Sequence, residues 1–259
     1  MTGLVRYDRE GHVATITYNR PEALNAINRE MRAELNDAWT RFRDDEDAWV
    51  AIVTGAGRAF CVGADLADPA GAAGTWPGSF WEIPTVNSFE SGMEIWKPTI
   101  AAVNGHCLGY GLTLVCACDF VIASQDAVFG FPEVTLGLPT IVGAIRLPGK
   151  IGWQRAMELL LTGERIGADR ARDLGLAGWV VPPADLLAEA RRLAGRLLAA
   201  APLAARATQE MAWRAPRLPW TEAVRMGEAM RRLAADSADA REAAAARREG
   251  RPPPQWTGC

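Results

Sequence analysis

A glycine-rich loop between an apolar run and a helical stretch constrains this chain more than any other feature. The run Thr99–Val103 suits a buried strand, and Leu112–Ala117 suits the start of a buried helix. Between them lie Gly105, Gly109 and Gly111. The first turn of a helix leaves backbone N–H groups free, and the helix dipole attracts negative charge there. The loop therefore predicts a site for an anion, or for an oxygen that becomes anionic during a reaction.

A single acidic residue, Glu133, follows this loop in an apolar neighbourhood. Its apolar neighbours in the sequence are Phe129, Phe131, Pro132, Val134 and Leu136. Burial raises the pKa of a carboxyl group toward the range that suits proton transfer near neutral pH. The stretch from Asn104 to Gly143 thus predicts two chemical tools, an oxyanion stabiliser and one carboxylate base.

A second loop of similar type lies earlier in the chain. Residues Ala59–Leu66 read as the end of a strand that turns through Gly63 into a helical segment. Such a loop can supply a second backbone N–H to an oxyanion hole shared with the first loop. The two loops together predict one site built from distant parts of the sequence.

Composition and charge argue against several classes of protein. The 259 residues are 49% hydrophobic, enough for a large buried core, and the net charge of -3 does not indicate a nucleic acid or an anionic membrane as partner. Only His12 and His106 are histidines, which argues against a histidine-based centre, and we expect no metal. The five cysteines lack disulfide or metal spacing, no signal segment opens the sequence, and no apolar run could span a bilayer. We therefore expect a cytoplasmic protein.

Strand and helix patterns alternate along most of the chain. We expect strands in a hairpin over Val5–Arg20 that turns at Asp8–Gly11, and at Trp49–Thr54, Thr99–Val103, Asp119–Ser124 and Ala177–Val181. We expect helices at Asn28–Arg43, Ser88–Trp96 and Ala168–Leu174, in two pieces over Ile141–Leu161 split by Pro148 and Gly149, and from Pro183 to about Arg248. The segment Ala67–Trp81 is rich in Gly, Ala and Pro, and we expect it to be mobile. Repeated strand-then-helix units predict an α/β fold with a parallel sheet flanked by helices.

The alternating pattern ends near Pro202. Helical, alanine-rich spacing follows it, with breaks at Pro202, Pro216 and Pro219, and the tail Arg251–Cys259 is not helical in pattern. We therefore expect a core over residues 1–201 and a helical C-terminal region over residues 202–259.

Several stretches, in this order and spacing, resemble the crotonase, or enoyl-CoA hydratase/isomerase, superfamily. They are Arg20–Ala26, Ala59–Leu66, Pro98–Gly111, Phe129–Gly137, Arg146–Pro148 and Leu161–Glu164. The resemblance runs from about Leu4 to Gly258, and the tail Gln255–Gly258 looks most like the branch that holds carnitinyl-CoA dehydratases. It implies a crotonase-like spiral of repeated β-β-α units, with C-terminal helices that cover the site or a neighbouring subunit. It also implies a homotrimer or a dimer of trimers that binds acyl-CoA, with coenzyme A as part of the substrate and no separate cofactor.

The resemblance also implies roles for individual residues. The backbone N–H groups of Ala64 and Tyr110 would form the oxyanion hole, and Glu133 would move the proton. Gly63 would permit the turn beside Ala64. The path of the nucleotide and pantetheine would be lined by Ala23, Leu24, Ala26, Ala59, Asp65 and Leu66.

Three departures from the family pattern leave the reaction open. Hydratases of this family commonly carry a second glutamate where this chain has Thr113, whereas double-bond isomerases often manage with one. A threonine hydroxyl can hold a water molecule but cannot act as a base near neutral pH. Tyr110 replaces the central glycine of the loop, and Ile141 stands where many members have glycine. We expect a reshaped acyl pocket.

The resemblance and the residues together predict a lyase or isomerase that acts on an enoyl-CoA thioester. We place hydration of a 2-enoyl thioester first among the candidate reactions, because proteins with similar sequences commonly catalyse it. Double-bond isomerisation fits a single glutamate, Glu133, at least as well. A carnitinyl-CoA dehydratase-like reaction, a hydrolysis on the same scaffold, and a non-catalytic acyl-CoA-binding protein stay open as alternatives.

Overall fold

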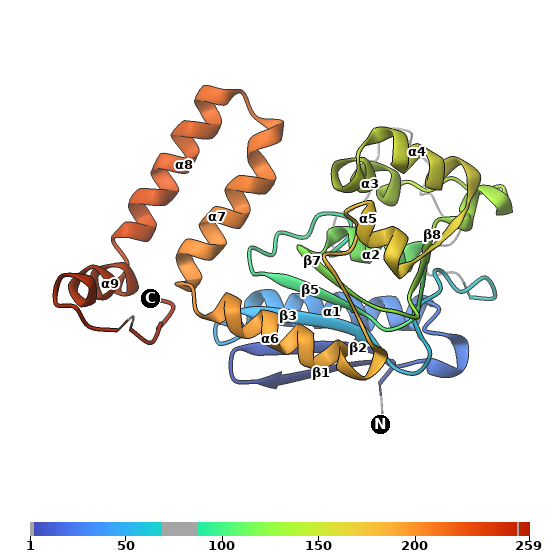
Figure 1. The fold of residues 1–259 in the computed structure, drawn as a ribbon, viewed down its shortest axis with the longest axis horizontal. Coiled ribbons are helices and arrows are strands. Elements are labelled where there is room, and N and C mark those ends of the chain that lie inside the picture. The colour runs from blue at the N-terminus through green and yellow to red at the C-terminus, as the bar shows by residue number, and fades with distance from the viewer. Residues whose placement is uncertain (1–2, 69–87, 253) are drawn as a thin grey trace.

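The described residues form a six-stranded and a four-stranded sheet, as the computed structural model of residues 3–68, 88–252 and 254–259 shows (Figure 1). The larger sheet has the order β1 (Val5–Glu10), β2 (Val13–Tyr18), β3 (Val50–Gly55), β5 (Thr99–Val103), β7 (Phe120–Ser124), β10 (Trp179–Val181). The smaller has the order β4 (Ala59–Cys61), β6 (His106–Leu108), β8 (Val128–Gly130), β9 (Arg165–Gly167). Pairing is parallel except between β1 and β2 and between β8 and β9.

Successive strands alternate between the two sheets. The chain passes from β3 to β4, from β5 to β6, and from β7 to β8, so that each turn places one strand in the larger sheet and one in the smaller. Helix α2 (Tyr110–Ala117) follows the middle turn, and the 3-10 helix Pro132–Leu136 follows the last. This alternation confirms the predicted spiral of β-β-α units and brings the ends of β4, β6 and β8 together.

Helices cover both faces of the larger sheet. Because side chains alternate along a strand, Val50 and Ile52 of β3 pack with α6 (Leu186–Leu198), whereas Ala51 and Val53 pack in the core that holds α1 (Arg29–Asp44). The α1 face was predicted correctly and consists of Met31, Leu35, Ala38, Trp39 and Phe42. The predicted cap is confirmed as well, since Asn28 Oδ1 accepts from the N–H of Met31 at 2.9 Å.

Several predicted local features are wrong. The segment Ser88–Trp96 forms a turn followed by irregular chain instead of a helix, because Gly92 adopts a φ of 117°. The hairpin turns at Gly11 and His12, and the described residues after Gly63, up to Asp68, form no helix. The predicted mobile segment lies, from residue 69 on, outside the described residues.

The break between the next two helices was also misplaced. Helix α3 (Val142–Ile151) continues through Pro148, and α4 (Trp153–Thr162) begins after Gly152. Gly152 has a φ of 81°, a left-handed value that ends α3. Helix α5 (Ala168–Asp173) then leads to β10.

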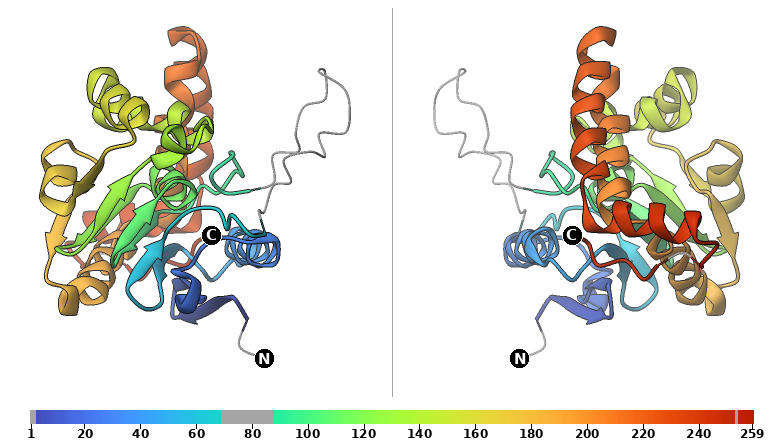
Figure 2. Two further views of the ribbon diagram at one scale, coloured as in Figure 1. Left: turned by 90° about the vertical axis from the view of Figure 1, so that its right-hand side faces the viewer. Right: turned by 90° about the vertical axis from the view of Figure 1, so that its left-hand side faces the viewer.

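The C-terminal region is helical, as predicted. Helices α7 (Pro202–Arg214) and α8 (Trp220–Ala235) lie side by side and rise beyond the sheets, and α9 (Ala238–Arg248) follows (Figures 1 and 2). The break before α9, capped by Ser237, was not predicted. Within the described residues no helix is long and apolar enough to cross a bilayer. The division of the chain at residue 202 stays a prediction.

Replacement of Asn25 by Ala should destabilise the loop that precedes α1. Asn25 is fully buried with a φ of 57°, and its side chain bonds the backbone of Arg20, Ala56 and Ala59. Loss of these bonds leaves buried backbone groups unpaired, so we expect the free energy of unfolding to fall by about 3 kcal/mol in urea titrations. The matched variant Asn36→Ala, on α1, should change it by less than about 0.5 kcal/mol. Equal effects of the two variants would contradict this account.

Candidate active site

A cavity of about 380 Å³ lies where the first turn of α2 meets the loop after β4 and the 3-10 helix Pro132–Leu136. Ala64, Tyr110, Thr113 and Glu133 all line it. These four residues come from three separate parts of the sequence, and the spiral brings them together because β4, β6 and β8 are neighbours in one sheet. The cavity therefore contains all four residues that were predicted to be catalytic.

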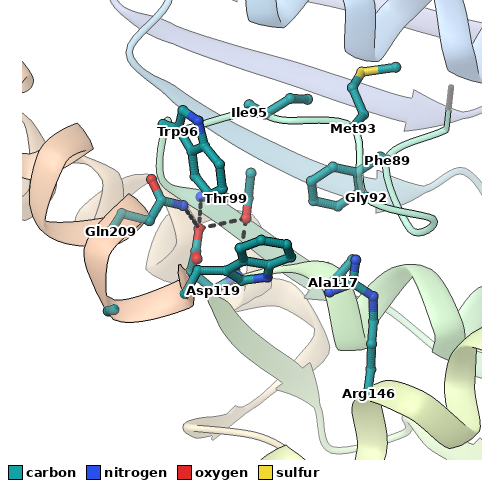
Figure 3. Close-up of a pocket in the computed structure, with 12 residues that line it drawn as sticks. Phe89, Gly92, Met93, Ile95, Trp96, Thr99, Ala117, Asp119, Arg146 and Gln209 are labelled. Carbon is teal, nitrogen blue, oxygen red and sulfur yellow. Dashed lines mark hydrogen bonds between the residues drawn. The ribbon is translucent and has the colours of Figure 1, made fainter. Parts of the chain in front are cut away.

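A second cavity, of about 230 Å³, lies beside the C-terminal half of α7 (Figure 3). Asp119 lines it, and one oxygen of its carboxylate accepts hydrogen bonds from the backbone and hydroxyl of Thr99 and from the side chain of Gln209. These bonds join the start of β5 to α7. The cavity holds none of the predicted site residues, and we assign Asp119 a structural role.

Two backbone N–H groups on the first cavity have no partner within their own elements. Ile27 N donates to Gly63 O at 2.8 Å and Asp65 N donates to Ile27 O at 3.0 Å, so the N–H of Ala64 itself points away from Ile27. Tyr110 is the first residue of α2, and its N–H therefore has no acceptor in the helix. Two such donors on one cavity could hold a single oxygen atom.

Glycines bring the elements of the site close together. Gly63 has a φ of 107°, and a Cβ atom there would lie 3.6 Å from Tyr110 N. A Cβ on Gly109, where φ is 54°, would lie 3.0 Å from Glu133 Oε1. The absence of side chains at these two positions leaves room for the N–H donors and for the carboxylate in the same small volume.

Glu133 presents a carboxylate with an unpaired oxygen. Its Oε2 is buried and has no hydrogen-bond partner among the described residues, and the same holds for the nearby hydroxyl of Thr140. Burial raises the pKa of Glu133 above the ordinary 4.5, and the backbone N–H of Glu133 and the nearby Thr140 hydroxyl, which lies outside hydrogen-bonding geometry, oppose that shift only in part. A half-buried carboxyl of this kind can accept and return a proton near neutral pH.

The raised pKa of Glu133 should also be visible in stability. The folded chain holds a proton that the unfolded chain releases above pH 4.5, so the free energy of unfolding should fall as pH rises from 4.5 through the raised pKa. Glu133→Gln should remove this decline. Urea titrations of both proteins between about pH 4 and 8 would measure it. A difference between wild type and variant that does not change with pH would contradict the shift.

Three polar residues form a charged corner of the cavity, which we call the Arg32–Glu90–Tyr110 cluster. The Tyr110 hydroxyl donates to Glu90 Oε1 at 2.5 Å, and Arg32 Nη2 lies 3.7 Å from the same oxygen. The Arg32 guanidinium also lies over the Tyr110 ring, 5.4 Å from its centroid. Burial, with the neighbouring Glu90 charge, raises the pKa of Tyr110 well above its ordinary value, so the phenol stays protonated and acts as a donor.

Sequence reasoning missed both charged members of this cluster. Arg32 follows the core residue Met31 on α1, and Glu90 lies in the segment that was predicted to be helical. No short-range spacing relates them to Tyr110. The one available signal was Tyr110 itself, because a phenol in a glycine loop needs a polar partner when it is buried.

Comparison with known proteins defines the family. The model of the enoyl-CoA hydratase/isomerase family matches residues 8–258. The chain belongs to this family. The (E)-benzylidenesuccinyl-CoA hydratase of Thauera aromatica is 40% identical over 210 residues, which are 80% of this chain and 81% of the relative. The carnitinyl-CoA dehydratase of Escherichia coli is 36% identical over 231 residues, 87% of this chain and 86% of the relative.

A solved structure supports the same assignment. An enoyl-CoA hydratase/isomerase from Mycobacterium paratuberculosis superimposes with a TM-score of 0.88 at 34% identity, covering 100% of both chains. These matches confirm the resemblance that the sequence motifs predicted. They make the chain an enzyme of the enoyl-CoA hydratase/isomerase type, and enzymes of this family act on coenzyme A thioesters.

Of the six residues predicted to bind coenzyme A, one lines the cavity of this hydratase/isomerase fold. Leu66 lines the cavity, and its side chain is 74% exposed. Asp65 forms an ion pair with Arg20 at 2.6 Å, and Arg20 also bonds the carbonyl of Ala26. The other five do not line the cavity itself, namely Ala23, Leu24, Ala26, Ala59 and Asp65. Ala59 is buried in β4. The binding role of all six stays a prediction.

Replacement of Tyr110 by Phe should destabilise the cluster. Glu90 is only 2% exposed, and the variant removes one hydroxyl donor from its buried carboxylate. We expect the free energy of unfolding to fall by about 1–3 kcal/mol, measured in urea. Tyr18→Phe is the matched control, because the Tyr18 hydroxyl is buried without a partner among the described residues, and its loss should be neutral or stabilising. A larger loss of stability in Tyr18→Phe than in Tyr110→Phe would contradict the hydrogen bond assigned between Tyr110 and Glu90.

Proposed function

We propose that this enzyme adds water to the double bond of a 2-enoyl-CoA thioester, with Glu133 as the group that moves the proton. The thioester oxygen accepts hydrogen bonds from the N–H groups of Ala64 and Tyr110. The observation that carries the proposal is the position of the Glu133 carboxylate on the same cavity as these two donors. Relatives named crotonyl-CoA hydratase and short-chain-enoyl-CoA hydratase support the reaction class.

The proposed reaction needs only one carboxylate. Glu133 takes a proton from water while the water oxygen bonds to C3, and electron density moves through C2 onto the thioester oxygen. The two N–H groups stabilise that enolate, and loss of one such donor typically costs about 3 kcal/mol. Glu133 then returns the proton to C2, which restores the carboxylate and completes the 3-hydroxyacyl thioester.

Glu90 is a second carboxylate on the cavity, but we do not assign the proton transfer to it. Its Oε1 accepts from Ser88 at 2.6 Å and from Tyr110 at 2.5 Å. A carboxylate held by these donors is anchored in place. Glu133 Oε2, which has no partner within the described part of the chain, is the freer oxygen.

Double-bond isomerisation is the second candidate, and Thr113 favours it. This residue lines the cavity where hydratases commonly carry their second glutamate, and it offers a hydroxyl only. In this reaction Glu133 removes a proton from C2 of a 3-enoyl thioester, which gives an enolate on the thioester oxygen, and then delivers the proton to C4 as the double bond moves to C2–C3. A carnitinyl-CoA dehydratase-like reaction would use the same oxyanion site to eliminate water.

Turnover of two substrates by the wild-type enzyme distinguishes these reactions. We expect mass spectrometry to show addition of water to 2-butenoyl-CoA. Conversion of 3-butenoyl-CoA to the 2-enoyl isomer without water uptake would identify the isomerase instead. Binding of both thioesters without conversion of either would contradict the proposed function and leave a non-catalytic acyl-CoA-binding protein.

We further propose a cytoplasmic homotrimer or dimer of trimers. Large apolar side chains stand exposed on α4 and α8, among them Trp153 at 70% and Trp220 at 83%. Exposed apolar groups of this size are typical of surfaces that pack against another chain. Sedimentation analysis of the purified protein would give its oligomeric state.

A further inference from the structure

The Arg32–Glu90–Tyr110 cluster takes no direct part in the proposed proton transfer, although all three side chains line the cavity. Two opposite charges in a site for an acyl group are costly to keep away from water. Their presence needs a reason beyond the transfer of a proton by Glu133. The inference below rests on the proposed function and extends it to the chemistry of the acyl group.

Hydroxyl groups, rather than a close ion pair with Arg32, supply the hydrogen bonds to the Glu90 carboxylate. Glu90 Oε1 accepts from Ser88 and Tyr110, and Ser91 Oγ lies 3.4 Å away. Arg32 Nη2 is 3.7 Å from this oxygen, which is longer than the roughly 2.7–2.9 Å of a charge-assisted hydrogen bond. Glu90 and the Tyr110 ring thus hold the guanidinium in place, and its N–H groups make no hydrogen bond to any residue that the structure describes.

The Arg32 side chain remains open to a ligand. It is 33% exposed, whereas Glu90 is 2% exposed. Among the described residues that line the cavity, Arg32 is the only cation. A guanidinium presents N–H donors in a planar fork, which fits the two oxygens of a carboxylate.

The rest of the cavity wall shows which acyl groups suit this corner. Leu136, Leu138 and Ile141 give the wall an apolar part. A plain alkyl chain against Arg32 would remove water from the guanidinium and replace none of its hydrogen bonds. A carboxylate at the end of a short apolar stretch would replace that water with two charge-assisted bonds.

We infer that the acyl group of the natural substrate carries a carboxylate, and that Arg32 binds it. Two charges on the cavity oppose this contact, namely Glu90 and Glu133. Hydroxyl donors already occupy Glu90 Oε1, and Glu133 faces the reacting carbons under the proposed function. Arg32 is therefore a specificity-determining residue, and the expected substrates are half-thioesters of unsaturated dicarboxylic acids.

Two thioesters of matched shape test the inference. In 4-carboxybut-2-enoyl-CoA the acyl chain ends in a carboxylate, and in 5-methylhex-2-enoyl-CoA an isopropyl group of the same shape replaces it. We expect wild-type kcat/KM to favour the carboxylate by about 10- to 100-fold, the range that charged hydrogen bonds support. Arg32→Met should abolish this preference, and Arg32→Lys, which keeps the charge without the fork, should retain part of it.

A matched control removes the same charge elsewhere on α1. Arg43 lies near the C-terminal end of the helix, where it is exposed and pairs with Asp44. The Arg43→Met enzyme should keep the wild-type preference for the carboxylate. Equal kcat/KM for the two thioesters in the wild type would overturn the inference while leaving the proposed hydration intact. An equal rise in KM for both thioesters in Arg32→Met would also overturn it, because Arg32 would then hold the coenzyme.

Binding measurements keep the test independent of turnover. If the wild type converts neither thioester, the proposed function fails, and calorimetric Kd values for the two still decide the inference. A 10-fold or larger preference for the carboxylate that disappears in Arg32→Met would support it. Equal Kd values would overturn it.

Discussion

Replacement of Glu133 by Gln should lower kcat for an enoyl-CoA thioester by about 10²–10⁴-fold. The amide has nearly the same shape as the carboxylate but cannot accept a proton from water or return one to carbon. Since the backbone donors on Ala64 and Tyr110 are untouched, binding of the thioester should change little. Initial rates with 2-butenoyl-CoA and calorimetric Kd values would measure the two effects separately.

The control for Glu133→Gln is the same change at an exposed position. Glu158 lies on α4 with an exposed side chain and does not line the cavity. Glu158→Gln should keep wild-type kcat. A Glu133→Gln enzyme that matches the wild type would remove Glu133 from the reaction, even though the family assignment would stand.

Gly109→Ala should damage both stability and activity. The backbone of Gly109 has φ 54° and ψ -120°, a conformation that residues with a Cβ atom rarely adopt. We expect the free energy of unfolding to fall by about 1–3 kcal/mol from this strain. The added methyl group would also meet Glu133 Oε1 at 3.0 Å and displace the carboxylate. A shift of about 1 Å at a reacting group can cost about 100-fold in rate, so we expect kcat to fall by that order.

Gly149→Ala is the matched control for this second variant. Gly149 lies within α3, and a Cβ atom there would meet no other atom within 4 Å. Alanine is a better helix former than glycine, so the variant should gain up to about 1 kcal/mol and keep its activity. Wild-type activity in Gly109→Ala would contradict the assigned contact between the loop and Glu133.

Local patterns predicted much of the fold and the centre of the site. The cap and buried face of α1 could be read from a few residues because they depend on short-range spacing. The pairing of the loop at Gly63 with the loop at Gly109 came from the family resemblance, and the structure places both loops on one cavity. Glu133 stood out because an acidic residue in an apolar stretch is unusual.

The segment Ser88–Trp96 shows why other features could not be predicted. Phe89, Met93 and Trp96 have helical spacing, yet Phe89 stacks on Trp39 at 4.0 Å and Gly92 turns the chain. A contact between residues far apart in sequence therefore overrides the local pattern. The same limit hid the Arg32–Glu90–Tyr110 cluster, whose members meet only after the spiral has formed.

Exchange of the C2 protons of butanoyl-CoA in D₂O tests the central claim most directly. This saturated thioester cannot take up water, so deuterium enters only if the cavity removes a C2 proton and holds the enolate. The account predicts exchange by the wild type, detected by mass spectrometry, and none by Glu133→Gln. Binding of butanoyl-CoA to the wild type without any exchange would contradict the claim that Glu133, Ala64 and Tyr110 form one enolate-stabilising site.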